Sequence, residues 1–241
     1  MADTTLIKGA RASRSTIALK LLMAGSGLIF IGFVLTHMYG NLKAFWGRES
    51  FNEYAHHLRV FGEPMLPENG LLWIIRIVLL VSLIVHVACA VTLAKRASRA
   101  RSQKYAVKKN KASSLSSRTM RWGGVTLLVF IVWHLINFTI GKVNVNANPN
   151  PAGGADGTSD PYLLLVDTFD VWWMTLIYLV AMLALAFHLH HGTWSALQTL
   201  GLTNSARSRT NAKAAGWVVA IVIAGGFSLV PLAVLTGVIT K

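Results

Sequence analysis

Residues 71–94 read LLWIIRIVLLVSLIVHVACAVTLA, and this stretch decides the fold class. A helix that crosses a bilayer needs about 20 consecutive, mostly apolar residues. This run is longer than a strand and apolar apart from Arg76, Ser82, His86 and Thr92, so it predicts a membrane-spanning helix. Four further stretches have the same character. The five expected spans are about 19–42, 71–94, 122–141, 171–191 and 215–238.

The composition of the whole chain supports this interpretation. The chain has 241 residues, of which 54% are hydrophobic and 13% are charged. A soluble domain carries about 25% charged residues, so an ordinary soluble fold is excluded. One cysteine, Cys89, excludes a disulfide scaffold, a structural zinc site and an iron–sulfur cluster held by this chain alone. We therefore expect an all-α integral membrane protein that forms a single domain over residues 1–241.

Lys and Arg are distributed unequally between the connecting segments. The basic loop 95–121 carries ten of them and no acidic residue. The side with the N-terminus holds 17 Lys and Arg, and the opposite side holds 6. The positive-inside rule then predicts a multi-pass protein of the plasma membrane with a cytoplasmic N-terminus and an external C-terminus. Membrane lipid is the expected partner of this basic surface, and nucleic acid is not, because the loop offers only Tyr105 for stacking on bases.

Two connections on the predicted outer side differ from each other in character. Residues 49–61 are mixed in polarity, which favours a short helix at the membrane interface. Residues 142–161 are rich in Asn, Gly and Pro, so we expect irregular structure there.

Each of the first four spans contains one deep histidine: His37, His86, His134 and His188. Ionisable groups within a bilayer are costly and therefore point to function. Because successive spans run in opposite directions, His37 and His134 fall near the outer face, and His86 and His188 fall nearer the cytoplasm. The histidines thus pair by depth, with roughly 10–20 Å between the two layers at ~1.5 Å per residue.

Two imidazoles from facing helices at one depth are typical ligands of a haem iron. Zinc favours four ligands that usually include Cys or carboxylate. Gly27 lies ten residues before His37, and Gly124 lies ten before His134, which favours the close approach of a flat group. The alternatives are that each histidine only hydrogen-bonds a neighbouring helix and that the glycines serve helix packing.

Five segments make the chain resemble the cytochrome b membrane-anchor subunits of type B succinate:quinone oxidoreductases, which include succinate dehydrogenase and fumarate reductase. These segments are THMYGNLKAF (36–45), FNEYAHH (51–57), IVHVACAVTLA (84–94), VWHLINF (132–138) and FHLHHGTWSALQTLG (187–201). In the last segment the family pattern is a haem histidine, a glycine four residues later and an aromatic residue two further on. His188, Gly192 and Trp194 fit this pattern, which selects His188 over His191 as the ligand.

The resemblance implies a four-helix bundle with two haems b and a fifth helix beside it. His86 and His188 would hold the haem nearer the soluble subunits, and His37 and His134 the distal haem. The implied partners are an iron–sulfur subunit and a flavoprotein subunit, and the implied electron acceptor is a membrane quinone, expected to be menaquinone. The resemblance assigns no succinate-oxidising residue to this chain and leaves a higher-order oligomer of the complex open.

The chain departs from the family at two positions. A Glu found in some members two residues before the fourth histidine is Ala186 here, and a Gln near the start of span three is replaced by Met120. A proton route through that glutamate is therefore not expected, and haem contacts at the start of span three do not transfer.

Further residues are candidates for contacts with the haem propionates and with the quinone. Propionates need cationic or hydrogen-bonding partners. We expect Arg76 beside the distal haem and Arg121 with Trp122 beside the other haem, unless these arginines extend to the membrane surface instead. For the quinone, hydrogen-bond donors gather at the end of span four, and we expect Trp194 and His191, with Ser26 facing them from span one. The alternative is that these are ordinary interfacial residues.

Two other functions remain open from the residues alone. One is a di-haem cytochrome b anchor of another respiratory dehydrogenase, of the hydrogenase or formate dehydrogenase type. The other is a transporter or proton channel without haem, which would use the histidines as a relay.

Overall fold

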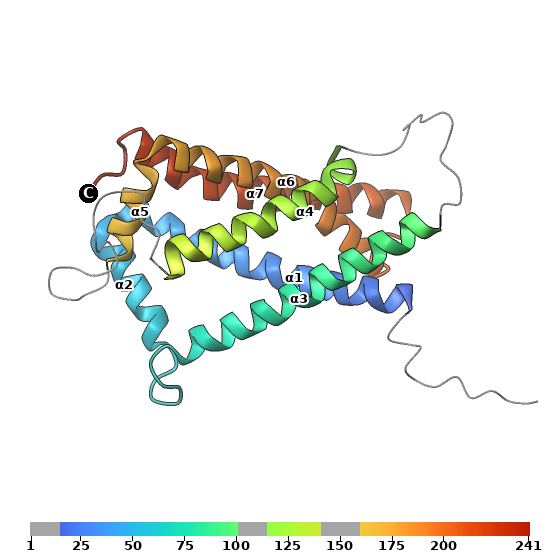
Figure 1. Ribbon diagram of the computed structural model, residues 1–241, viewed down its shortest axis with the longest axis horizontal. Helices are drawn as coiled ribbons and strands as arrows, with labels where there is room; N and C mark the ends of the chain where they lie inside the picture. The colour runs from blue at the N-terminus through green and yellow to red at the C-terminus, as the bar shows by residue number, and fades with distance from the viewer. Residues whose placement is uncertain (1–14, 101–114, 141–159) are drawn as a thin grey trace, which may run out of the picture.

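The computed structural model describes residues 15–100, 115–140 and 160–241, which form a bundle of helices (Figure 1). Five helical segments are long and apolar enough to cross a membrane, which confirms the expected all-α integral membrane class. Their main helices are α1 (Thr16–Leu42), α3 (Gly70–Arg99), α4 (Leu115–His134), α6 (Trp172–Thr199) and α7 (Ala206–Leu235). α4 continues without a break as the π-helix η3 (Leu135–Ile140).

Three short elements complete the described structure. A 3-10 turn, η2 (Lys43–Trp46), joins α1 to α2 (Gly47–Val60), so the helix expected near residues 49–61 is present. The helix α5 (Pro161–Phe169) was not expected. Asp160 caps it by accepting a hydrogen bond from the Leu163 backbone N–H at 3.0 Å, and proline fits the first turn of a helix. The irregular structure expected over 142–161 lies outside the described residues, except at its last two positions.

The helices extend beyond the limits predicted from hydropathy. α3 runs to Arg99 and α6 to Thr199, and α4 and α7 begin at Leu115 and Ala206. A helix satisfies its own backbone hydrogen bonds in water as well as in lipid, so charged residues continue these helices past the apolar runs. Part of the expected basic loop is therefore helical, and residues 101–114 of it lie outside the described part of the chain. Arg121 and Trp122 lie within α4, not at its start.

Small residues allow α6 and α7 to pack closely, and these two helices share the most extensive contact in the bundle. On α7, Gly216, Ala220 and Ala224 are buried in this contact. A Cβ atom on Gly216 would lie 2.6 Å from the carbonyl oxygen of His190 on α6. The backbones therefore approach as closely as glycine permits, a common form of packing in membranes.

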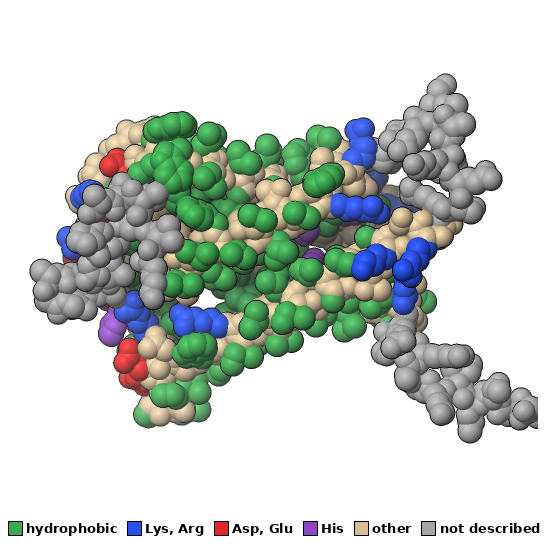
Figure 2. Space-filling view, in the orientation of Figure 1, with side chains coloured by type: hydrophobic (Ala, Val, Ile, Leu, Met, Phe, Trp, Pro, Cys, Tyr) green, Lys and Arg blue, Asp and Glu red, His purple; other side chains and the backbone are tan. Residues whose placement is uncertain are grey.

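The two ends of the bundle differ in charge. Of the described acidic residues, all lie on α2, on α5, beside α5 or between α2 and α3: Glu49, Glu53, Glu63, Glu68, Asp160, Asp167 and Asp170. We call this the acidic end. The opposite end, the basic end, is formed by the start of α1, the end of α3, the start of α4, the end of α6 and the start of α7. Lys and Arg stand there without acidic neighbours on the face that Figure 2 shows.

Hydrogen bonds and ion pairs tie the elements together at each end. At the basic end, Arg96 donates from Nη1 to the Thr16 hydroxyl at 3.1 Å, which joins α3 to α1. At the acidic end, Arg48 on α2 forms an ion pair with Asp160, which caps α5. Lys241 Nζ lies 2.8 Å from Oδ1 of Asp167, a fully buried carboxylate on α5. The last residues of the chain are thus held against α5.

Candidate functional site

The four deep histidines meet in two pairs, as their depth predicted. His37 on α1 and His134 on α4 form the acidic-end pair, with ring centres 5.8 Å apart and ring planes at 78°. His86 on α3 and His188 on α6 form the basic-end pair, with ring centres 6.2 Å apart and planes at 52°. Each pair joins two helices that are not neighbours in the sequence.

Aromatic rings surround the acidic-end pair. Phe33 stacks on His37 one turn away, with ring centres 5.3 Å apart and planes at 10°. Other rings within 6 Å of the pair are those of Phe130, Phe138 and Phe227. These side chains make the surroundings of the two imidazoles apolar.

Glycines lie beside the basic-end pair. A Cβ atom on Gly27 of α1 would lie 3.5 Å from Cε1 of His86, and one on Gly124 of α4 would lie 3.8 Å from Cε1 of His188. Bare backbone of both helices therefore faces the two imidazoles. This supports the expectation that a flat group lies close by, although the glycines serve the basic-end pair and not the histidines ten residues further along their own helices.

A spacing of ten residues relates the two layers on all four helices. Ten residues of helix rise about 15 Å, so each helix brings a histidine to one layer and a second residue to the other. The two members on each helix are Gly27 and His37, Arg76 and His86, Gly124 and His134, and Tyr178 and His188.

Two of the histidines hydrogen-bond a hydroxyl group through Nδ1. Ser26 Oγ lies 3.1 Å from Nδ1 of His86, and Tyr178 Oη lies 3.3 Å from Nδ1 of His134. A histidine that binds a metal commonly uses its second ring nitrogen in this way, which fixes the ring and leaves Nε2 for the metal. Nδ1 of His188 is buried without a hydrogen-bond partner among the described residues.

The spacing within the pairs fits two ligands on opposite sides of one metal ion. Metal–imidazole nitrogen bonds are ~2.0–2.1 Å long and the ring centre lies about 1 Å beyond the nitrogen, so the ring centres should be ~6 Å apart. The observed 5.8 and 6.2 Å agree with this. The described residues include no group of three or more His, Cys, Asp or Glu that could hold a metal ion. Pairs of histidines suit an iron whose other ligands come from a porphyrin.

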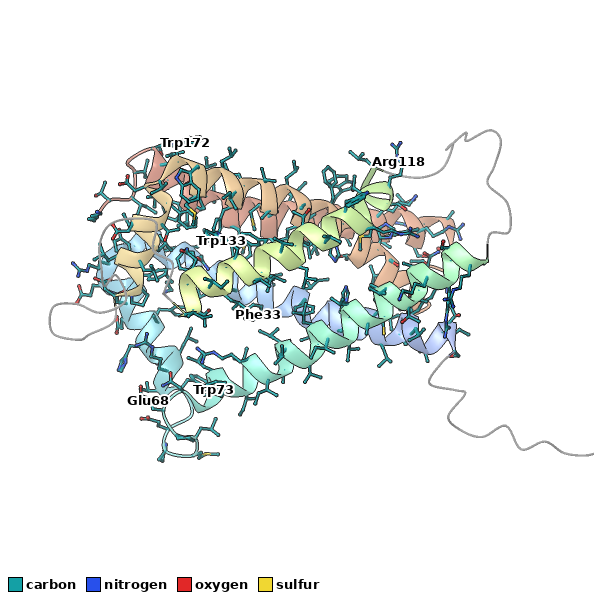
Figure 3. All side chains as sticks on the ribbon, in the orientation of Figure 1. Phe33, Glu68, Trp73, Arg118, Trp133 and Trp172 are labelled. Carbon is teal, nitrogen blue, oxygen red and sulfur yellow. The ribbon has the colours of Figure 1, made fainter. Side chains whose placement is uncertain are left out.

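Arg76, expected near a haem propionate, lies at the level of the acidic-end pair. It is exposed, and its guanidinium carbon lies 5.1 Å from the ring centre of Trp73 at the start of α3, labelled in Figure 3. The structure shows no protein anion bound to it among the described contacts.

Arg121 and Trp122, expected beside the other haem, are both exposed on α4, and 78% of Trp122 is accessible. Trp122 lines a cavity of about 240 Å³ between α4 and α6 that also reaches His188. Arg121 does not line this cavity, so the structure brings only Trp122 to the basic-end pair.

The residues expected at the quinone are only partly brought together. The ring centres of His191 and Trp194 lie 6.1 Å apart, and Lys213 of α7 places Nζ 5.6 Å from the Trp194 ring centre. Trp194 Nε1 is buried without a hydrogen-bond partner among the described residues. Ser26 instead contacts His86, as described above.

Neighbouring His190 has a different environment. It stacks on Trp217 with ring centres 4.2 Å apart, and its Nδ1 lies 2.9 Å from Ser116 Oγ. Nδ1 of His190 is thus hydrogen-bonded within the bundle.

Tyr178 is the residue of this site that the sequence argument missed. A signal was present, because Tyr178 precedes His188 by the same ten residues that separate each glycine from its histidine. Only the structure shows that its hydroxyl reaches His134 on another helix.

A known protein shares this sequence pattern. The chain is 29% identical over 184 residues to a protein of Bacillus subtilis (strain 168) named succinate dehydrogenase cytochrome b558 subunit, and the match covers 76% of this chain and 79% of that protein. The chain is thus similar to a succinate dehydrogenase cytochrome b subunit over most of its length. The resemblance seen in the sequence is thereby confirmed, and the family gives a context to the histidine pairs. No protein-family model matches the chain, and no solved structure matches it significantly.

Proposed function

We propose that the chain is the di-haem cytochrome b anchor of a succinate dehydrogenase, the respiratory complex II, and passes electrons from an iron–sulfur subunit to a membrane quinone. The observation that carries this proposal is the two facing histidine pairs, with ring centres 6.2 and 5.8 Å apart, one above the other in a single bundle. The name of the Bacillus subtilis relative supplies the enzyme to which such an anchor belongs.

In this proposal His86 and His188 hold one haem b, and His37 and His134 hold a second. Such a haem supplies one-electron transfer, because two imidazole ligands leave the iron no open position for oxygen. Gly27 and Gly124 leave space beside the basic-end pair. Phenylalanine rings around the acidic-end pair exclude water.

The basic end is proposed as the cytoplasmic side on which the soluble subunits dock. Exposed cations gather there on three helices: Lys95, Arg99, Arg118, Arg121, Arg207, Arg209 and Lys213. Part of this charge meets anionic lipid, at about 1 kcal/mol per residue near the surface. The iron–sulfur subunit must also approach this end, because the basic-end pair is the histidine pair nearer to the proposed cytoplasmic side. The flavoprotein subunit, which oxidises succinate, lies beyond it.

The electron acceptor is proposed to be a quinone, with menaquinone expected. Oxidation of succinate to fumarate releases two electrons and two protons, and reduction of a quinone to a quinol takes up the same number. A quinone carbonyl accepts hydrogen bonds, and the buried Nε1–H of Trp194 is a donor without a partner among the described residues. His191 beside it supplies a second polar group.

Replacing these two residues tests the quinone site. We expect Trp194→Phe and His191→Leu each to slow quinone reduction severalfold, because each removes a protein group that would hydrogen-bond the quinone headgroup. Both haem spectra and the reduction of a soluble dye by succinate should remain as in the wild type. Wild-type quinone kinetics in both variants would place the site elsewhere.

Replacing the histidines one at a time tests the proposal as a whole. Reduced-minus-oxidised spectra and haem content should show His86→Ala and His188→Ala losing one spectral component, and His37→Ala and His134→Ala losing the other. His56→Ala, at an exposed histidine on α2, is the control and should retain both components.

Three outcomes would contradict parts of the proposal. Loss of the same component in His37→Ala and His86→Ala would show that the pairing is wrong. A wild-type protein without haem would favour a transporter or proton channel. Co-purification with a hydrogenase or formate dehydrogenase would keep the two haems and change the enzyme.

A further inference from the structure

Tyr178 is buried beside His134 and has no freedom to turn away. Its side chain is 6% exposed, and its hydroxyl oxygen lies 3.3 Å from Nδ1 of His134. Phe130 and Phe169 pack edge-on against its ring, each with ring centres 4.9 Å apart. The ring is therefore fixed with its hydroxyl directed at the histidine.

A buried chain of polar groups continues from Tyr178 on the side away from the histidine. The side-chain amide of Asn137, 1% exposed, lies close enough to the Tyr178 hydroxyl to interact with it. Nδ2 of Asn137 also lies 3.5 Å from the hydroxyl oxygen of Thr168, which is 0% exposed and donates its own proton to the Leu164 carbonyl at 2.7 Å. Polar groups inside an apolar bundle are costly unless they are hydrogen-bonded, and Oδ1 of Asn137 is buried here without a hydrogen-bond partner among the described residues.

The backbone is irregular at the same place. Asn137 belongs to the π-helix η3, which begins directly after His134. Turns of this kind are rare within α-helices and recur at functional sites. Here the π-helix that follows His134 sets the amide of Asn137 against Tyr178, which lies on another helix, α6.

The basic-end pair has a simpler arrangement. Ser26 contacts Nδ1 of His86, and the Ser26 hydroxyl donates to the backbone carbonyl of Leu22 at 2.8 Å on its own helix. Among the described hydrogen bonds, no side chain continues from Ser26. The two histidine pairs thus differ in the polar side chains that continue beyond the hydroxyl group at Nδ1.

We propose that Tyr178 sets the reduction potential of the acidic-end haem through its hydrogen bond to His134, with Asn137 and Thr168 holding the tyrosine in place. This inference rests on the proposed function. An imidazole that binds iron through Nε2 keeps its proton on Nδ1, so Tyr178 accepts the hydrogen bond. Such a bond makes the ligand more basic, which stabilises the oxidised iron and lowers the potential. Tyr178 is therefore a positioning residue that acts through His134.

Redox titration of the haems in the whole complex tests this inference. We expect Tyr178→Phe to keep both haems and to raise the potential of the acidic-end haem alone. The expected change in its reduction equilibrium is about tenfold, which is 59 mV for one electron. The electron paramagnetic resonance signal of the same oxidised haem should also shift. Tyr162→Phe is the matched control, because it removes a buried hydroxyl that donates to the Thr240 carbonyl at 2.8 Å and bonds no histidine among the described hydrogen bonds.

The outcomes separate this inference from the proposed function. Two haems in the wild type together with an unchanged potential in Tyr178→Phe would overturn the role of Tyr178 and leave the proposed function intact. An equal shift of both haems, or an equal shift in Tyr162→Phe, would also overturn it. If Tyr178→Phe loses the haem, Asn137→Leu is titrated instead, because it leaves His134 and Tyr178 in place. A change confined to the acidic-end haem supports the inference, and no change overturns it.

Discussion

Gly27 shows how a single missing side chain can define the space beside the basic-end pair. A Cβ atom there would lie 3.5 Å from Cε1 of His86, which is ordinary van der Waals contact, so alanine fits and a larger side chain does not. We expect Gly27→Leu to lose most of the basic-end haem and Gly27→Ala to retain it, as measured by haem content per complex. Gly32→Leu on the same helix, with no atom within 4 Å of its Cβ position, should retain both haems. Full haem content in Gly27→Leu would mean that the porphyrin lies elsewhere.

The pairing of the histidines could be predicted from the sequence, but their hydrogen-bond partners could not. Depth along an apolar run follows directly from residue number, because every residue of a helix adds the same rise. The partner of a side chain also depends on how each helix is rotated about its axis. Spans that are apolar on all sides carry little information about that rotation, since any face can meet lipid. Ser26 was therefore expected at the quinone and is found at His86.

At the scale of the helices, the contact between α6 and α7 depends on Gly216. A Cβ atom at this position would lie 2.6 Å from the His190 carbonyl oxygen, so Gly216→Ala must push the two helices apart. We expect it to lower stability by about 1–3 kcal/mol, the usual range for overpacking. Gly225→Ala, with nothing within 4 Å of its Cβ position, should be neutral or stabilising by up to about 1 kcal/mol. Thermal unfolding in detergent measures both, and equal melting temperatures would contradict the close approach.

Asp160 makes the attachment of α5 depend on pH. Burial opposes its ionisation, but hydrogen bonds from the Leu163 N–H and the Asn52 amide and the ion pair with Arg48 together hold its pKa below the usual value. A lowered pKa in the folded state means that this stabilisation is present above the unfolded value of about 3.9 and is lost as the pH falls through the folded value.

Asp160→Asn isolates the charge, because asparagine caps a helix as well as aspartate does. We expect a loss of up to about 1 kcal/mol at pH 7, since Arg48 is largely exposed. The difference from the wild type should vanish in acid. Melting curves over a pH series measure this, and a constant difference at every pH would contradict it. Glu53→Ala, at an exposed position of α2, is the control.

The existence of the five spans could be predicted from hydropathy, and their ends could not. Hydropathy identifies the residues that suit the bilayer interior, whereas a helix ends where its hydrogen bonding ends. Arg99 and Arg118 therefore lie within helices (Figure 3 labels Arg118). The short helix α5 was missed because it follows a stretch rich in Asn and Gly. Its own start signal, Asp160 followed by Pro161, was present in the sequence.

For the whole molecule, the separation of charge between the two ends is the observation from which the proposed docking side follows. All described acidic residues lie at the acidic end, and Lys and Arg dominate the other end (Figure 2). The sequence predicted this separation, because an odd number of spans and the Lys and Arg counts fix which segments share a side. The histidine pairs indicate which helices face each other across the bundle, α1 with α4 and α3 with α6, but not which helices pack side by side. The contact between α6 and α7 was not foreseen.

Labelling of single cysteines tests the orientation from which the docking side follows. Cys89 is buried and stays in place, while Glu53→Cys exposes a thiol on α2 and Ser98→Cys exposes one at the end of α3. We expect a membrane-impermeant maleimide to label Glu53→Cys in intact cells and Ser98→Cys only after the membrane is opened. Segments rich in Lys and Arg are retained in the cytoplasm during insertion. The reverse pattern would put the basic end outside, and an iron–sulfur subunit in the cytoplasm would then meet the acidic-end pair first. Electrons would have to enter at His37 and His134, and the quinone site proposed at Trp194 would lie at the far end of the path.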